Sequence, residues 1–592
     1  MNLSAIYHKS CDNMCYALDE NNVVITLRTG KDIDKVIIHS GDPYTSGTMG
    51  GCNTWFGDPT EITEKLELPD YILWSVTITP PFKRLKYYFQ IFCGSESTYY
   101  IESGFKTKHE MFNCTGERED FQFPWINPSD VYKAPAWVND TIWYQIFPER
   151  FCNGDASISP EGTLPWPDDS TQITFWDKFG GDIKGITSKL DYIKDLGING
   201  LYLTPINTAP STHKYDTSDY YEIDPHFGDI ETVQNFVKES HSRGIRVMFD
   251  GVFNHCGPFF DKWQDVVKNG PESLYYNWFM INKWPLMKRE GYKPVNSING
   301  VYYTFGFFDN MPKLNTNNLE VIDFFLDVCT YWVKTFDIDA IRLDVANEVS
   351  HTFCKALRQR MLSLKSDFYI LGEIWHDATQ WLRGDEFDSV MNYPLSESAN
   401  EFWLNPGSSK KTLQYSINRC YSLYPKQVNN ILFNLLDSHD TARLIRRLDG
   451  NINKLYQLLA LLFTMPGTVC IYYGTEIALD GGHDPDCRRP MPWTMIESGK
   501  YNDRIEIIKK LISLRKKNAV FKSDKYSFTD VSNNDRVVSY TKTYNDTVIE
   551  IILNCSTENL NYPVESENII FSNLYENNIL HHDGVLIAIK NQ

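Results

Sequence analysis

Residues 229–255, DIETVQNFVKESHSRGIRVMFDGVFNH, contain one helix followed by one strand, and this pattern decides the fold. Asp229 can cap a helix whose apolar residues recur at helical spacing, and Gly244 suits its end. The run Ile245–Phe249 is apolar throughout except at one position, which predicts a buried strand. Asp250 and further polar residues follow directly, so chemically active side chains gather where this strand ends.

The same alternation of strands and helices repeats between about residues 140 and 520. Eight runs have the character of strands: Thr141–Phe147, Gly200–Leu203, Ile245–Phe249, Ile338–Leu343, Phe368–Glu373, Phe387–Met391, Asn430–Leu435 and Thr468–Tyr473. Helical spacing also recurs from Ile183 to Leu196, with Gly197 as a stop. Eight such units predict an α/β fold, a closed (β/α)₈ barrel. A doubly wound open sheet is the alternative, but no G-x-G-x-x-G fingerprint opens it.

Two β-rich regions flank the barrel, and one insertion interrupts it. Residues 1–125 are short runs of β-branched and aromatic residues between turn residues, which predicts an N-terminal β-sandwich. The barrel is predicted over 126–520, and the stretch 256–318 is too long for an ordinary loop after strand three, so it predicts an inserted subdomain. Residues 521–592 return to a β pattern and predict a C-terminal β domain, a second β-sandwich.

The composition excludes several classes of protein. The chain has 57 Lys and Arg against 76 Asp and Glu, and a net charge of −19 disfavours binding to nucleic acid or to an anionic membrane. It contains no run of about 18 apolar residues and no leader with a basic and then an apolar part, so a cytoplasmic protein is expected. Thirteen scattered cysteines without a C-x-x-C pair predict reduced thiols, not a disulfide framework or zinc cluster.

Carboxylates accompanied by His, Asn or Arg follow four of the eight predicted strands. The clusters are Asp250 with Asn254 and His255, Arg342 and Asp344 with Asn347 and Glu348, Glu373 with His376, and Asp437 with His439 and Asp440. A single carboxylate after a strand is most often a helix cap. Four clusters at the C-terminal face of a barrel, where active sites lie, predict acid/base chemistry on an acetal or a divalent metal site.

Arg342 favours the first of these chemistries. It lies two residues before Asp344, so the two side chains share one face of a strand. A nearby guanidinium lowers a carboxylate pKa and fixes its orientation, as a nucleophile requires, and it would repel a metal cation. Glu373 lies beside Ile374 and Trp375, an apolar setting that suits a general acid. This pair is typical of a retaining glycosidase, and a metal-dependent hydrolase is disfavoured further because no H-x-x-x-H pair occurs.

The clusters and their order resemble glycoside hydrolase family 13, the α-amylase family. The matching segments are Asp250–His255, Ile341–Glu348, Gly372–His376, Leu436–Asp440 and Gly467–Glu476. Val345–Glu348, Met311–Asn315 and the N-terminal module, which is similar to a starch-binding domain, resemble the neopullulanase, cyclomaltodextrinase and maltogenic amylase subgroup. The resemblance implies a retaining hydrolase of α-1,4 and some α-1,6 glucosidic bonds in cyclodextrins, pullulan and short maltodextrins, with transglycosylation as an accompanying reaction.

The resemblance also implies a role for each matching residue. Asp344 would be the nucleophile, Glu373 the general acid/base and Asp440 the stabiliser of the transition state. The substrate-binding residues would be His255, Arg342, His439, Asp484, Arg488 and Tyr215. A structural calcium site would be formed by Asn153, Asp155, Ser159, Gly180 and Asp182. Some relatives have Asn-Asp shortly after the first pair of calcium-binding residues, whereas this chain has Ala-Ser-Ile-Ser at 156–159. Ser159 would replace a charged ligand there, so fewer charges would surround the ion.

Other functions stay open at this point. One is an oligo-1,6-glucosidase or a transglycosylase of the same family, and another is a sugar-binding relative that has lost catalysis. The last predicts missing carboxylates, whereas Asp344, Glu373 and Asp440 are all present. In the subgroup the N-terminal module commonly covers the active site of a partner, so the resemblance implies a homodimer.

Overall fold

The computed structural model describes residues 1–45, 55–113, 118–288 and 293–590, and it divides into two compact units. Unit 1 comprises Met1–Lys133, Thr379–Gly384 and Lys411–Asn429. Unit 2 comprises Ala134–Ala378, Asp385–Lys410 and Asn430–Gln592. Most of the predicted barrel and the predicted C-terminal β region therefore belong to unit 2, whereas residues 126–133, 379–384 and 411–429 of the predicted barrel belong to unit 1. Every predicted site residue lies in unit 2.

The N-terminal part of unit 1 is a β-sandwich, as predicted. One sheet has the order β1-β2-β6-β5, the other β4-β3-β7-β8-β9 with β10 on β7, and all pairs are antiparallel. The strands are β1 Cys15–Ala17, β2 Val23–Thr29, β3 Lys35–Gly41, β4 Asp58–Glu61, β5 Glu64–Glu67, β6 Ile72–Ile78, β7 Leu85–Cys93, β8 Glu96–Ile101, β9 Gly104–Lys106 and β10 Phe121–Phe123. Alternate residues of both sheets, such as Ile25, Trp74, Ile38 and Phe89, share one apolar core.

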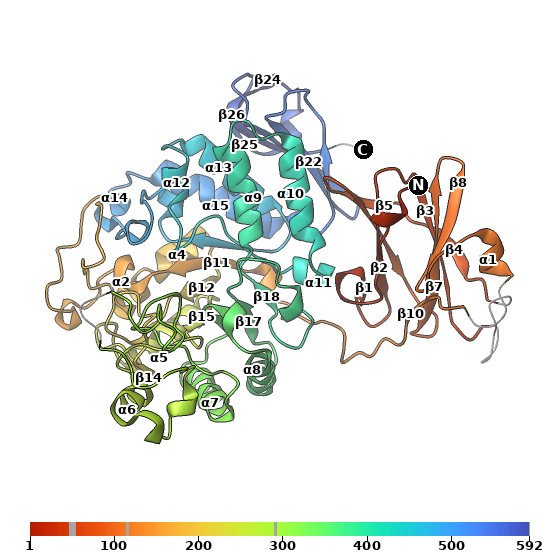
Figure 1. The fold of residues 1–592 in the computed structure, drawn as a ribbon. Coiled ribbons are helices and arrows are strands. Elements are labelled where there is room, and N and C mark those ends of the chain that lie inside the picture. Colours follow the sequence, from red (N-terminus) through yellow and green to blue (C-terminus); the bar gives the residue numbers. More distant parts are fainter. Residues whose placement is uncertain (46–54, 114–117, 289–292, 591–592) are drawn as a thin grey trace. The chain divides into compact units, whose positions relative to one another are not determined.

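Unit 2 contains the predicted (β/α)₈ barrel (Figure 1). Its parallel sheet has the order β18-β17-β16-β15-β12-β11-β20-β19, and a parallel bridge between Met391 and Phe433 joins the two ends. The strands are β11 Ile142–Ile146, β12 Gly200–Leu203, β15 Arg246–Gly251, β16 Ala340–Leu343, β17 Tyr369–Gly372, β18 Ser389–Val390, β19 Phe433–Asn434 and β20 Thr468–Tyr472. All eight predicted strands are confirmed. They could be recognised from the sequence because a strand that is buried on both faces is a continuous apolar segment.

Helices surround these strands in Figure 1. The principal ones are α5 Ile230–Ser242, α7 Leu319–Phe336, α8 His351–Leu364, α9 Tyr393–Leu404, α13 Ile452–Thr464 and α15 Asn502–Lys517. Asp229 caps α5 by accepting the N–H of Thr232, as predicted, and Gly244 after it has a φ of +70°. The expected helix over 183–196 is two helices, α3 Ile183–Ser188 and α4 Leu190–Leu196, because the N–H of Lys189 bonds only three residues back.

An insertion, a short strand pair and a C-terminal sheet extend the barrel. The insertion after β15 contains α6 Asp261–Asn269 and short bridges such as Phe279–Leu314, and β13 Asn207–Thr208 pairs with β14 Asp219–Ile223 after β12. The C-terminal strands are β21 Tyr526–Thr529, β22 Val537–Tyr544, β23 Thr547–Asn554, β24 Leu560–Asn561, β25 Ile569–Glu576 and β26 Ile579–Ile589. They form one connected antiparallel sheet where two were expected, because the long β26 pairs with β23, β24 and β25.

Two expectations from composition concern the whole chain. The eleven cysteines in the described ranges are free thiols, and two others, Cys52 and Cys114, lie outside those ranges. Within the same ranges, no helix has both the length and the apolar character that a bilayer crossing needs.

Candidate active site

The predicted polar clusters meet at one end of the barrel. Asp250 lies in the last part of β15, Asp344 follows β16 and Glu373 follows β17. The N–H of Asp344 bonds to the carbonyl of Gly251, and the N–H of Glu373 to that of Leu343, at 3.1 and 3.0 Å. The strand ladder thus extends to the site residues and fixes neighbouring carboxylates side by side.

Arg342 lies at the centre of these carboxylates. It is fully buried, and its Nη1 is 2.8 Å from Oδ1 of Asp250 and 2.9 Å from Oδ1 of Asp344. Its Nη2 forms an ion pair with Oε2 of Glu373 at 2.8 Å. The predicted pairing of Arg342 with Asp344 is confirmed, and one guanidinium also joins the carboxylates of two adjacent strands.

The pKa of Asp344 differs from the expectation. Arg342 lowers it, as predicted, but burial raises the pKa of Asp344 well above its usual range, and the carboxylates of Glu373, Asp250 and Asp440 raise it further. Arg342 has to compensate three buried carboxylates at once, so its effect on any one of them is reduced. Sequence spacing reveals the neighbouring arginine, but it does not reveal this sharing.

Glu373 is held at both of its oxygens. Oε2 accepts the backbone N–H of Val345 at 2.9 Å, and Oε1 accepts the indole N–H of Trp375 at 3.0 Å. Val345 has a left-handed backbone with φ 45° and ψ 45°, which is rare for a β-branched residue. This conformation points its N–H at Glu373, so backbone strain is used to orient the carboxylate.

Tyr215 and His439 form one hydrogen-bonded layer beside the carboxylates. The Tyr215 hydroxyl is 2.9 Å from Oδ2 of Asp250 and 2.7 Å from Nε2 of His439, and the two rings are parallel within 7°. His255 is also buried, and its ring stacks on Phe305 at 5.1 Å. Burial lowers the pKa of His439 well below its usual range and that of His255 to about 3. Both imidazoles are therefore neutral at pH 7, and Nε2 of His255, which has no hydrogen-bond partner among the described residues, is suited to binding a sugar hydroxyl.

Asp440, Asp484 and Arg488 also come together, although 44 residues separate the first two. Nη1 of Arg488 is 2.8 Å from Oδ1 of Asp484, and Nη2 is 3.4 Å from Oδ1 of Asp440. Nε of the same guanidinium donates to the carbonyl of His439 at 2.9 Å. The structure thus brings all nine predicted catalytic and substrate-binding residues to the same end of the barrel.

Three other residues of this site have no role predicted from the sequence. Asp250 is the acceptor shared by Arg342 and two tyrosine hydroxyls, one of them from Tyr202 at 2.8 Å. The side chain of Gln145 lies 2.8 Å from Nδ1 of His439. The available signal is a polar residue inside an otherwise apolar strand, as Gln145 is in β11.

The five residues expected to bind calcium lie in the loop after β11 and before α3. Asn153 donates to Ser159 at 2.9 Å, and a Cβ at position 180 would come within 2.5 Å of Oγ of Ser159, so only glycine fits there. Asp182 caps α3 with Oδ1 and holds the N–H groups of Gly154 and Asp155 with Oδ2.

The carboxylates of this loop already have partners within the chain, since Asp182 accepts three backbone N–H groups. Asp155 pairs with Lys184 at 2.5 Å, and no group of three or more His, Cys, Asp or Glu side chains in the described part of the chain could hold a metal. The donor set therefore does not fit a tightly held calcium ion, which favours several uncommitted carboxylate oxygens.

Calcium binding consequently stays a prediction of the resemblance, and the arrangement predicts that any affinity is weak. A chelator such as EDTA is expected to leave the melting temperature unchanged, because an ion that is not bound adds nothing to the free energy of unfolding. Differential scanning calorimetry with and without the chelator measures this. A large fall in melting temperature that added calcium restores would show that a tight site exists.

Comparison with known proteins agrees with this architecture over its whole length. The model described as alpha amylase, catalytic domain, matches residues 145–524, and alpha amylase, N-terminal ig-like domain, matches residues 1–127. A cyclomaltodextrinase of Geobacillus thermopakistaniensis (strain MAS1) is 45% identical over 95% of this chain and 93% of its own. An intracellular maltogenic amylase of Bacillus subtilis is 41% identical over 99% and 98%. A solved structure of a cyclomaltodextrinase matches with a TM-score of 0.88 and 36% identity, covering 100% and 98%.

The chain therefore belongs to the α-amylase family of glycoside hydrolases. Its full-length relatives place it in the subgroup of cyclomaltodextrinases, maltogenic amylases and neopullulanases, as its subgroup motifs predicted.

Proposed function

We propose that this protein is a retaining α-glucan hydrolase that opens cyclodextrins and cleaves pullulan and short maltodextrins, mainly at α-1,4 bonds. One observation carries the chemistry: a single buried guanidinium, that of Arg342, holds Asp344 and Glu373 at its two terminal nitrogens. Two carboxylates fixed side by side, one to attack and one to transfer a proton, are the requirement of a retaining mechanism.

In this mechanism Asp344 attacks the anomeric carbon while Glu373 protonates the departing glycosidic oxygen. The bonding electrons go to that oxygen, and a glycosyl ester on Asp344 forms. Water, or a second sugar in transglycosylation, then attacks the ester while Glu373 accepts its proton, and the α configuration is retained. Asp440 and the neutral His255 and His439 would hold the hydroxyl groups of the reacting ring.

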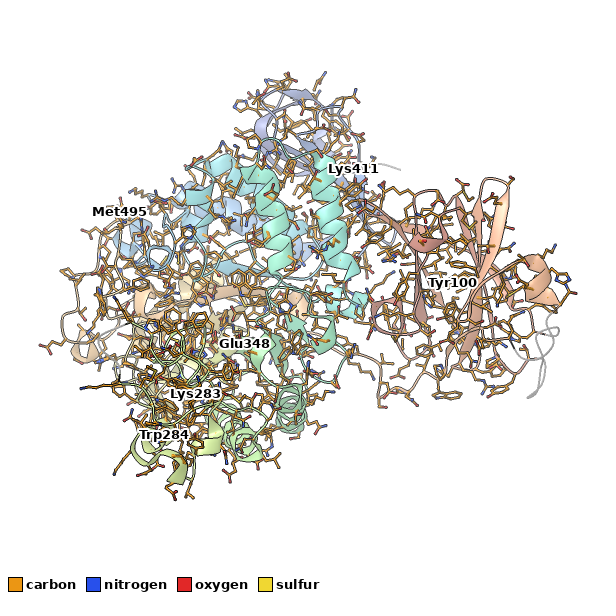
Figure 2. All side chains as sticks on the ribbon, in the orientation of Figure 1. Tyr100, Lys283, Trp284, Glu348, Lys411 and Met495 are labelled. Carbon is orange, nitrogen blue, oxygen red and sulfur yellow. The ribbon has the colours of Figure 1, made fainter. Side chains whose placement is uncertain are left out.

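The substrate class is supported by the relatives and by the meeting of the two subgroup motifs. Lys313, in the motif Met311–Asn315, lies 2.8 Å from the carboxylate of Glu348, in the motif Val345–Glu348. It also contacts Asn254, which follows β15. Glu348 is labelled in Figure 2, in the turn after β16. The inserted subdomain is thus tied to the loop that carries Asp344, which favours a site shaped by both.

The test of the substrate class compares initial rates on β-cyclodextrin, pullulan and soluble starch, with products identified. Faster opening of β-cyclodextrin, ending in maltose, is the expected result. A site that the inserted subdomain narrows would admit small rings and exclude long polymers. Comparable rates with panose from pullulan would indicate a more open site of the neopullulanase type. Activity on none of the three would favour an α-1,6-specific enzyme or a sugar-binding relative without catalysis.

Homodimer formation is a second part of the proposal. The resemblance implies it, and unit 1 exposes three large aromatic rings around one guanidinium: Tyr44, Phe82 and Trp125 lie 4.7, 6.0 and 5.9 Å from Arg84. Each ring is about half exposed, and clustered exposed aromatics are typical of protein interfaces. We propose that a second copy of this chain covers them. The name of the B. subtilis relative supports a cytoplasmic location.

Sedimentation equilibrium at micromolar concentration tests the dimer. The wild-type protein is expected at twice 68.7 kDa, and the double variant Phe82→Ser/Trp125→Ser at the monomer mass, because two anchors of the patch are lost. A monomeric wild-type protein would contradict the proposed dimer. A variant that remains dimeric would place the interface elsewhere.

A further inference from the structure

One tryptophan connects the proposed acid/base residue to a buried ring on the next helix. Trp375 lies two residues after Glu373, and its Nε1 donates to Oε1 of Glu373 at 3.0 Å. Its indole stacks on Tyr393 with ring centroids 3.6 Å apart and planes within 7°. Tyr393 is the first residue of α9 and only 2% exposed, whereas Trp375 is 45% exposed. The indole is therefore supported on one face by Tyr393 and is partly exposed elsewhere.

The two oxygens of Glu373 are not equivalent. Oε2 accepts the N–H of Val345 at 2.9 Å and forms an ion pair with the guanidinium of Arg342 at 2.8 Å. The left-handed backbone of Val345 and the ion pairs of Arg342 fix these two groups, so an acidic proton on Oε2 would meet one positive hydrogen and one positive charge. The proton that Glu373 transfers has to be carried on Oε1, which has one donor, the N–H of Trp375.

We propose that Trp375 is a positioning residue that acts through Glu373, which rests on the proposed hydrolase function. In the first step the proton on Oε1 passes to the glycosidic oxygen, the C1–O bonding electrons go to that oxygen, and Asp344 bonds to C1. Oε1 thereby becomes part of a carboxylate that accepts the indole N–H. Hydrogen bonds to a charged acceptor are stronger than those to a neutral one. This bond strengthens as the proton leaves, so it favours the transition state over the ground state.

The stack on Tyr393 makes this role possible. An exposed side chain held by one hydrogen bond could rotate away, but the parallel rings fix the plane in which the N–H lies. Replacing Trp375 by Phe keeps a flat ring for that stack and removes the donor. The substitution thus separates two effects of Trp375: the hydrogen bond that orients Glu373 and the packing of its ring on Tyr393.

The experiment measures kcat/KM of Trp375→Phe and wild type on a series of phenyl α-maltosides whose phenol leaving groups differ in acidity but little in size. Leaving groups that depart without a proton, such as 2,4-dinitrophenolate, need no acid. The variant is expected to lose about tenfold or more on the unsubstituted phenyl maltoside and little on the dinitrophenyl one. The dependence of rate on leaving-group pKa is therefore expected to be steeper than in wild type.

A matched control is available at the other end of the barrel. Trp137, before β11, donates its indole N–H to the carbonyl of Asp367 at 2.9 Å, so Trp137→Phe loses the same kind of bond away from the site. Trp137→Phe is expected to leave kcat/KM unchanged on every phenyl α-maltoside. Trp375→His keeps a ring N–H, so its dependence of rate on leaving-group pKa is expected to lie between those of Trp375→Phe and wild type.

Two outcomes for Trp375→Phe would overturn the proposal. An equal loss across the series would mean that Trp375 only packs against the leaving group, and an unchanged series would mean that its N–H does nothing for the acid. A dependence in Trp375→His as steep as in Trp375→Phe would also contradict it. Failure of the proposed function is distinct, because the wild-type protein itself would then be inactive on every maltoside.

Discussion

Asp344→Asn is expected to lower kcat by about 10⁴-fold or more, the range found when a catalytic unit loses its nucleophile. The amide cannot form the glycosyl ester, while its shape still fills the space beside Arg342. Initial rates on the fastest of the tested glucans measure the effect. Near-normal turnover would show that another group attacks and that the assignment of Asp344 is wrong.

Two controls separate this loss from a loss of structure. The melting temperature of Asp344→Asn is expected to equal or exceed that of wild type, because the change removes one of three buried carboxylates around one guanidinium. Asp191→Asn alters a solvent-exposed carboxylate that pairs with Arg243, and its activity is expected to match wild type. Inactivity accompanied by a much lower melting temperature would point to misfolding.

Arg342→Met is expected to lower the free energy of unfolding by about 3–5 kcal/mol or more, the cost of breaking a buried ion pair at one partner. Methionine fills similar volume but leaves Asp250, Asp344 and Glu373 buried without a compensating charge. Activity is expected to fall with stability, since both proposed catalytic carboxylates lose their common support. Denaturant unfolding followed by tryptophan fluorescence measures the change.

The suitable comparison is Arg358→Met. Arg358 is also buried, but its ion pair is with one carboxylate, that of Asp388. Its loss is expected to cost less than that of Arg342 and to leave the proposed catalytic residues in place. If Arg342→Met were as stable as wild type, the three carboxylates could not depend on this guanidinium, and protonation would have to neutralise them.

Local sequence predicts the parts of this molecule that depend on neighbours along the chain. Every barrel strand is a short buried run, so it can be recognised alone, and the strand ends then indicate where Asp344, Glu373 and Asp440 gather. The break at Lys189 cannot be predicted in this way, because Ile186 and Leu190 keep helical spacing on both sides of it. The buried face is preserved while the backbone tightens.

Other properties of the site depend on residues far apart in sequence. The raised pKa of Asp344 follows from burial and from carboxylates that three other strands supply, and no local pattern contains that sum. Gln145 lies beside His439 across 294 positions of sequence. The single C-terminal sheet likewise depends on the length of β26 and on three partners, which alternation of apolar residues does not specify.

The charges around Arg342 also determine what kind of molecule the site attracts. The carboxylates of Asp250, Asp344, Glu373, Asp440 and Asp484 face the two guanidiniums of Arg342 and Arg488, and the neighbouring imidazoles are neutral. Burial and the neighbouring carboxylates disfavour the ionised form of Asp344, and a ring that develops positive charge at its anomeric carbon stabilises that form, whereas a neutral sugar does not. The pocket is thus preset for an oxocarbenium-like cation, and small protonated amines and imino sugars should enter it in competition with the natural substrate.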